Sequence, residues 1–343
     1  MNSNIFQPFL RSFGIAISVL TLSASVWPQL FSYYLIDQPV NDIAYSRTTG
    51  MIYASVPSTG GNLGNHIIVV NPNSRTIVNS VFAGSEPNKL AVTSDGKYLY
   101  VGLNGSSSVK RYPLSNMSSD ISFNLGSGSN GFFIAEDIAP ILNRPDVVAV
   151  SRQNTCCSPR HEGVAIYENG VQLPTVTPRT SETNEIEAGG DQTALFGYNN
   201  ETSGFQYRRL SVDGTGVSIG LSQPNTFGAY SLKIRYSQGR VYASNGKIVE
   251  AYTGVPVGEF ALGGFANGLA VDRQNRRALF VMGSTLRAFH SLTFQPIGVV
   301  NLPTNVHNQA QLTRWGRRGV AYRTNDGKLA IAESLLITRK TAQ

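Results

Sequence analysis

Residues 86–112 of the chain read EPNKLAVTSDGKYLYVGLNGSSSVKRY. This stretch holds two apolar runs, at 90–92 and 98–101, and a third strand-like run at 109–112. The pair Asp95-Gly96 separates the first two runs, and Asp-Gly between β-rich runs is a strong hairpin signal because the turn needs positive φ. The stretch therefore predicts three consecutive antiparallel strands.

The same strand–turn–strand unit recurs along the chain, at 43–54, 232–243, 269–281 and 311–322. A second strand–turn–strand half also recurs, for example at 66–78 and 163–172. Four short strands in each repeat of about forty to fifty residues are the signature of a β-propeller. We expect seven units, which begin near Val40, Asn88, Gly131, Asn184, Phe227, Asn267 and Val306.

The two ends of the repeat region complement each other. The seventh unit ends after its third strand, at 329–336, whereas the apolar segment 31–36 precedes the first unit and has no partner there. An N-terminal strand that completes the last blade would remove an open sheet edge. The predicted fold is therefore all-β, a seven-bladed β-propeller of four-stranded blades whose N-terminal strand closes the last blade.

The N-terminus has the features of a secretory signal. Arg11 supplies a positive charge, residues 13–22 are apolar, and Ser23-Ala24-Ser25 offers small residues for cleavage. We predict a signal peptide at 1–26, a single propeller domain at 27–343, and a secreted or periplasmic protein. The apolar segment is shorter than the roughly 20 residues of a membrane span, so no stable span is expected, although an uncleaved anchor stays open.

Charge is concentrated in the turns between the first and second strands of the units, which gather on one side of a propeller. The predicted basic face carries Arg276, Arg277, Arg317 and Arg318, in a chain with a net charge of +7. The corresponding turns also hold Arg47, Lys97, Arg240 and Arg273. Such a positive field attracts anionic partners. The alternative is a set of solvated turns without a partner. No Lys/Arg run with interleaved aromatic residues is present, so no nucleic-acid partner is expected.

The opposite side of the disc holds the longest irregular insertion, residues 151–162. Its adjacent cysteines, Cys156 and Cys157, could form a disulfide with each other, pair between molecules or stay free. Because loops on a rigid scaffold often carry recognition, we predict ligand contacts by Arg160 and His161, with further contacts from the channel rim. These rim residues are Glu86, Asn88 and Asn267. The alternative is a loop without a binding role.

Residues 87–101, PNKLAVTSDGKYLYV, resemble the YVTN-type propeller repeat. Members of that family are often extracytoplasmic, and their folds are similar to those of lactonases and quinoprotein dehydrogenases. The lactonase-like resemblance implies a central divalent metal held by carboxylates and amides, which suits Ca²⁺. Its candidate ligands here, which could equally be turn-forming residues, are Glu86, Asn88, Glu185, Asn225 and Asn267.

Fold alone does not define activity. A quinone site would need a cluster of tryptophans, and the chain has two. We therefore expect no metal and no cofactor, and a non-catalytic binding or scaffold module for a protein or glycan partner in the envelope or extracellular space. The alternatives are a metal-dependent, lactonase-like hydrolase and a purely structural domain of an envelope assembly.

Overall fold

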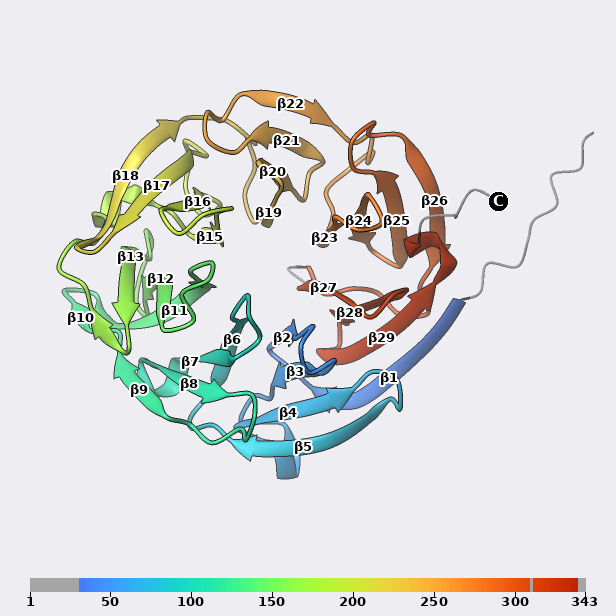
Figure 1. The fold of residues 1–343 in the computed structure, drawn as a ribbon, viewed down its shortest axis with the longest axis horizontal. Coiled ribbons are helices and arrows are strands. Elements are labelled where there is room, and N and C mark those ends of the chain that lie inside the picture. The colour runs from blue at the N-terminus through green and yellow to red at the C-terminus, as the bar shows by residue number, and fades with distance from the viewer. Residues whose placement is uncertain (1–30, 309–310, 339–343) are drawn as a thin grey trace, which may run out of the picture.

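The computed structural model describes residues 31–308 and 311–338, and these form a ring of seven β-sheets around a common axis (Figure 1). This confirms the prediction of a seven-bladed propeller. The described residues contain no α-helix, only the short 3-10 helices η1 (Gly61–Leu63), η2 (Asn104–Ser106), η3 (Arg179–Ser181) and η4 (Leu335–Ile337). No helix in this part of the chain is long and apolar enough to cross a membrane. The predicted signal peptide, 1–26, lies outside the described residues.

The first four blades follow one another along the chain. Blade one is β2 (Asp42–Tyr45), β3 (Ile52–Ser55), β4 (His66–Asn71) and β5 (Thr76–Phe82). Blade two is β6 (Pro87–Val92), β7 (Tyr98–Leu103), β8 (Ser108–Pro113) and β9 (Ile121–Asn124). Blade three is β10 (Ser127–Gly128), β11 (Gly131–Pro140), β12 (Val147–Asn154), β13 (His161–Glu168) and β14 (Val171–Gln172). Blade four is β15 (Glu185–Ala188), β16 (Ala194–Tyr198), β17 (Tyr207–Asp213) and β18 (Gly216–Gln223).

The remaining blades complete the ring. Blade five is β19 (Ile234–Ser237), β20 (Arg240–Ala243), β21 (Lys247–Glu250) and β22 (Pro256–Glu259). Blade six is β23 (Gly268–Asp272), β24 (Arg277–Met282), β25 (Thr285–His290) and β26 (Pro296–Asn301). Blade seven is β27 (Leu312–Trp315), β28 (Gly319–Arg323), β29 (Lys328–Ser334) and β1 (Phe31–Pro39).

Blade three departs from the regular pattern. It has a fifth strand, β10, which pairs with the start of β11, and its outer strand β14 has only two residues. The predicted insertion at 151–162 is shorter than expected, because β12 and β13 extend into both of its ends and leave 155–160 as the connecting loop. Residues 151–154 and 161–162 belong to the strands because strand pairing satisfies their backbone N–H and C=O groups.

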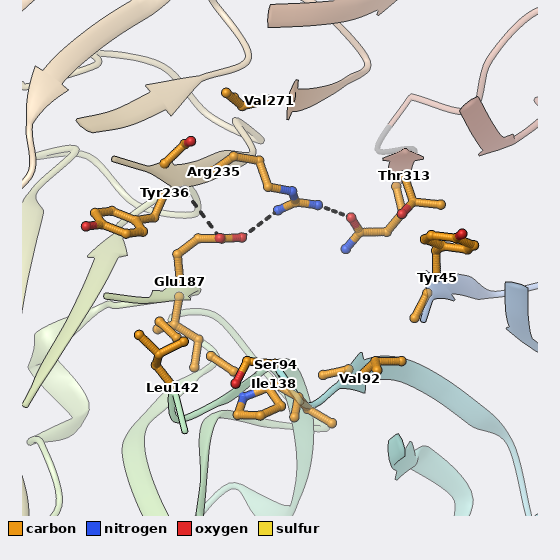
Figure 2. A pocket seen from close by; sticks show the side chains of 18 of the residues that line it. Tyr45, Val92, Ser94, Ile138, Leu142, Glu187, Arg235, Tyr236, Val271 and Thr313 are labelled. Atoms are coloured by element: carbon orange, nitrogen blue, oxygen red, sulfur yellow. Dashed lines mark hydrogen bonds and ion pairs between the residues drawn. The ribbon is translucent and has the colours of Figure 1, made fainter. Parts of the chain in front are cut away.

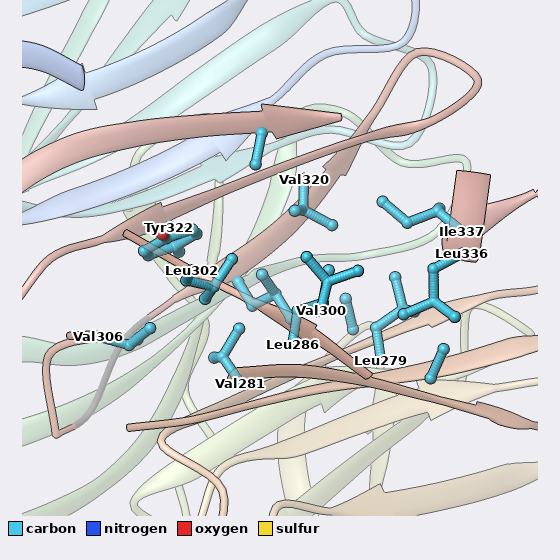
Figure 3. Packing of buried hydrophobic residues seen from close by; sticks show 14 of the residues in the cluster. Leu279, Val281, Leu286, Val300, Leu302, Val306, Val320, Tyr322, Leu336 and Ile337 are labelled. Atoms are coloured by element: carbon cyan, nitrogen blue, oxygen red, sulfur yellow. The ribbon is translucent and has the colours of Figure 1, made fainter. Parts of the chain in front are cut away.

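The hydrophobic core is divided among the interfaces between blades, because each sheet buries both of its faces against its neighbours. Figure 3 shows one such cluster, between blades six and seven, where Leu279, Val281 and Leu286 meet Val320 and Tyr322. The middle strands are accordingly continuous apolar runs, as in β24, where the side chains of Ala278 to Val281 are fully buried. The apolar content of these strands therefore holds adjacent blades together.

Strand β1 closes the ring from the outside. It lies along β29 in Figure 1 and pairs with it antiparallel, from Phe31 opposite Ser334 to Pro39 opposite Lys328. Its side chains enter two cores: Tyr33 and Leu35 pack against the cluster between blades six and seven, and Ile36 packs in that between blades seven and one. The predicted closure by residues 31–36 is confirmed.

Candidate functional site: the central channel

The innermost strand of every blade runs along the channel from one end to the other. Polar side chains at the starts of these strands line a cavity of about 380 Å³, which we call the narrow-end cavity. The ends of the same strands, with the turns that follow them, line a cavity of about 720 Å³ at the opposite end, which we call the wide mouth. Both volumes lie in the range of ligand-binding pockets.

An ion pair spans the wide mouth. Arg235 on β19 donates to the Glu187 carboxylate on β15, with Nη1 2.9 Å from Oε1, and also hydrogen bonds to Gln311 across the channel (Figure 2). The other oxygen of Glu187 accepts the backbone N–H of Tyr236 at 3.3 Å. Burial raises the pKa of Glu187, although Arg235 opposes this effect. The pair is thus fixed in place by both strands.

Buried carboxylates join the inner edges of neighbouring blades. Asp42 accepts the backbone N–H of Leu90 in the next blade at 2.9 Å, and Asp137 accepts that of Ile186, also at 2.9 Å. These N–H groups lie on the free inner edges of the sheets, where an unpaired buried donor would be costly. Burial raises the pKa of both aspartates. Both carboxylates therefore have a structural role between blades.

A buried ion pair lies at the start of β15 and just before β19. The ammonium of Lys233 donates to Oε1 of Glu185, and both side chains are less than a tenth exposed. Although burial opposes ionisation, Lys233 and then Lys89 hold the pKa of Glu185 below its usual range. A pair at this depth depends on both partners, because either charge alone would be buried without compensation.

The loop at 155–160 is tied to the end of β12 by one side chain. Asn154 accepts the backbone N–H groups of Cys156 and Cys157, each at 3.0 Å, and its amide donates to Glu162 at 2.9 Å. The structure joins the two cysteines in a disulfide on the exposed loop. At the end of this loop Arg160 donates to Glu201 at 2.7 Å, within the narrow-end cavity.

The predicted ligand contacts have different locations. Arg160 and Asn88 both line the narrow-end cavity. His161 is buried beneath it, with Nε2 2.9 Å from the Ser181 hydroxyl. The side chain of Asn267 accepts the backbone N–H of Gly283, and neither it nor Glu86 is among the residues that line the cavity.

The predicted basic face needs one correction. Arg276, Arg317 and Arg318 are exposed, but Arg277 is buried and donates to the carbonyl of Thr338 at 3.1 Å. It is the first residue of β24, and its guanidinium reaches the segment that follows η4. Arg47 and Arg273 extend the exposed set at the wide mouth. The basic sector, formed by turns of blades six, seven and one, is defined as Arg47, Arg273, Arg276, Arg317 and Arg318.

The acid directly before Arg273 in the sequence is already neutralised. Asp272 is buried and accepts Nε of Arg314 at 2.9 Å and the side-chain amide of Asn275 at 2.8 Å. Burial alone would raise the pKa of Asp272, but the Asn275 and Arg314 contacts outweigh it and lower that pKa. Among the described residues of the basic sector, only Arg318 has a carboxylate within ion-pair range, Glu333 at 3.7 Å.

The residues proposed as metal ligands are dispersed. Of the five, Asn88 and Glu185 line the narrow-end cavity, and Glu185 already binds Lys233. Within 31–308 and 311–338, no group of three or more His, Cys, Asp or Glu side chains is arranged to hold a metal ion.

Sequence reasoning missed most of the charged channel lining. It comprises Asp42, Lys89, Glu136, Asp137, Glu187, Lys233, Arg235 and Arg323. A signal was available, because the inner strands of blades one to five align as Asp-Ile-Ala, Lys-Leu-Ala, Asp-Ile-Ala, Glu-Ile-Glu and Lys-Ile-Arg. A charged residue directly before Ile or Leu marks the same channel position in each of these five blades.

No protein-family model and no curated sequence matches the chain. Among solved structures, hydrazine synthase of Kuenenia stuttgartiensis matches with a TM-score of 0.66 and 12% identity, over 89% of this chain and 98% of that chain. The Cps50 (Swd1) β-propeller domain of Myceliophteria thermophila matches with a TM-score of 0.66 and 10% identity, over 88% and 99%. At such identities the likeness shows the fold alone, and the chain is a seven-bladed β-propeller.

Proposed function

We propose that this propeller is a non-catalytic binding module that acts outside the cytoplasm and holds an anionic protein or glycan partner on its wide-mouth face. One observation carries the proposal: three successive blades present five exposed arginines there, and four of them have no carboxylate within ion-pair range in the described residues. Unpaired surface arginines produce a one-sided positive potential that attracts and orients anions. Turns on a rigid β-scaffold are also common positions for binding residues.

Two further features support the location. The N-terminal sequence resembles a secretory signal, and the adjacent cysteines form a disulfide in the structure, which is typical of oxidising compartments. The YVTN-type resemblance of residues 87–101 fits the same proposal, since members of that family are often extracytoplasmic.

Retention on immobilised heparin tests the anionic partner. We expect the triple variant Arg276→Ser, Arg317→Ser, Arg318→Ser to elute at clearly lower salt than the wild type, because it removes three charges from one face. The control removes the same charge outside the basic sector, through Arg75→Ser in the β4–β5 turn, Arg144→Ser in the β11–β12 turn and Arg179→Ser in η3. If the two triple variants elute together, net charge alone explains retention and the basic sector is not a binding surface.

A further inference from the structure

The narrow-end cavity is polar on every side. It is lined by Asn41, Asn88, Lys89, Glu136, Gln153, Arg160, Glu185, Asn200, Glu201, Ser231, Lys233, His307 and Arg323. A cavity without aliphatic or aromatic lining suits a small hydrophilic molecule that is held by hydrogen bonds. It lies at the opposite end of the channel from the wide mouth.

Most charges around the cavity are paired with one another. Arg160 binds Glu201, Lys233 binds Glu185, and the amide of Asn184 donates to Glu136 at 2.9 Å. The lining contains four cationic side chains and three carboxylates, and the buried carboxylate of Asp42 acts on two of the cations, Lys89 and Arg323. With Asp42 included the charges balance, so an anion in this cavity would be held by individual donors and not by an excess of charge.

Two cations keep donors that have no direct acceptor. No hydrogen bond or ion pair joins the Lys89 ammonium to the described residues, although the carboxylates of Asp42 and Glu185 act on it electrostatically. Nε of Arg323 is buried without an acceptor in the same part of the chain. The cavity also has an unpaired acceptor, because the side-chain oxygen of Gln153 is buried without a donor. Buried groups of this kind normally have partners, and a bound ligand would supply them.

Both cations interact electrostatically with one buried carboxylate, that of Asp42. Asp42 lies between their blades and influences the pKa of both. Burial opposes protonation of Lys89, but Asp42 and Glu185 outweigh it and raise the pKa of Lys89, so the ammonium stays charged. Burial lowers the pKa of Arg323, with Asp42 opposing this effect, as expected for a guanidinium that lacks a direct carboxylate partner.

We propose that the narrow-end cavity binds a small hydroxylated monocarboxylate, of the chemical class of a uronate sugar. Lys89 and Arg323 receive its carboxylate. Its hydroxyl groups bond to the amide side chains of the wall, Asn41, Asn88 and Gln153. A doubly charged anion is disfavoured, because the carboxylates of Glu136 and Glu185 belong to the same wall.

Isothermal titration calorimetry with three probes tests this proposal on the wild-type protein. The probes are D-glucuronate, D-glucose, which lacks the carboxylate, and acetate, which lacks the hydroxyls. We expect glucuronate to bind, and glucose and acetate each to bind at least about tenfold more weakly. Glucose lacks the carboxylate that would bond to the cations, and acetate lacks the hydroxyls that would bond to the wall. Absence of glucuronate binding, or equal binding of glucose or acetate, overturns the proposal.

Variants assign the binding to the cavity. Lys89→Met should weaken glucuronate binding by about tenfold or more, whereas Lys97→Met, which changes an exposed lysine in the following turn, should leave it unchanged. Asn88→Asp, nearly isosteric, places a negative charge in the cavity and should have a similar effect if the first variant does not fold. Glucuronate affinity that is insensitive to Lys89→Met and Asn88→Asp, or that falls in the basic-sector triple variant, refutes binding in this cavity.

Discussion

Strand β1 closes the ring, and Ile36 is its most buried side chain. Truncation of Ile36 therefore tests how much this closure contributes to the stability of the fold. Ile36 is 6% exposed and packs in the core between blades seven and one, with Leu329 and Trp315 among its cluster. Truncation to alanine removes three carbon atoms from this core and leaves a cavity. On the same strand Tyr34 is 40% exposed, so Tyr34→Ala is the matched control.

The size of the effect follows from this burial. Ile36→Ala should lower the free energy of unfolding by about 2–4 kcal/mol. In a domain of this size each kcal/mol shifts the Tm by about 2 °C, so the Tm should fall by about 4–8 °C. Tyr34→Ala should lower the Tm by no more than about 2 °C, as for a partly exposed residue away from the core.

Differential scanning calorimetry measures both variants, and hydrogen exchange gives the location of the change. Because β1 supplies the outer partners of β29, amide hydrogens of residues 328–334 should exchange faster in Ile36→Ala than in Tyr34→Ala. If the two variants melt within about 1 °C of each other and β29 keeps its protection, β1 does not hold the ring closed.

Three further predictions concern the charged and cysteine-containing sites. Lys233→Met should lower the free energy of unfolding, measured by chemical denaturation, by about 3–5 kcal/mol because it leaves Glu185 buried and unpaired. Adding Glu185→Leu should restore most of this stability. No recovery in the double variant would contradict the pairing. Because the pKa of Asp272 is lowered in the fold, its ionised carboxylate stabilises the protein above the unfolded pKa of about 3.9, and this stabilisation is lost as the pH falls through the folded pKa. The Tm of Asp272→Asn should therefore fall less between pH 6 and pH 3 than the Tm of the wild type. Equal decreases in Tm would argue against this role of Asp272. The unreduced protein should contain no thiol that reacts with a thiol reagent, because Cys156 and Cys157 are joined in a disulfide. Reduction should shift the Tm by no more than about 1 °C, because this disulfide closes only a small ring. Two reactive thiols in the unreduced protein would show that the disulfide is absent.

The sequence was sufficient to predict the blades because their signal is local. Asp95-Gly96 and its counterparts need particular turn residues, and the apolar runs on either side repeat at a constant period. The closing strand was also predictable, because an apolar segment at 31–36 and a unit short of one strand imply each other.

Local patterns also misled in two places. The polar residues at 151–154 have no apolar alternation and were assigned to a loop, yet they pair with β11 in the ladder. Arg277 was placed on the surface with its neighbour Arg276. Arg276 lies in the turn with positive φ, whereas Arg277 is the first residue of β24, pairs with Asp272 and His290, and is buried. Strand register, which depends on pairing with distant residues, determines both outcomes.

The channel was decided by tertiary structure alone. Lys89 and Arg323 belong to blades two and seven, and Lys233 and Glu185 lie 48 residues apart. Only closure of the ring brings these side chains to one cavity and removes the water that would otherwise solvate them. The sequence by itself determined the strands, the turns and the number of blades, since each depends on residues close along the chain. The cavity depends on the balance of charge and hydrogen bonding among residues from six blades, and this balance exists only in the folded ring.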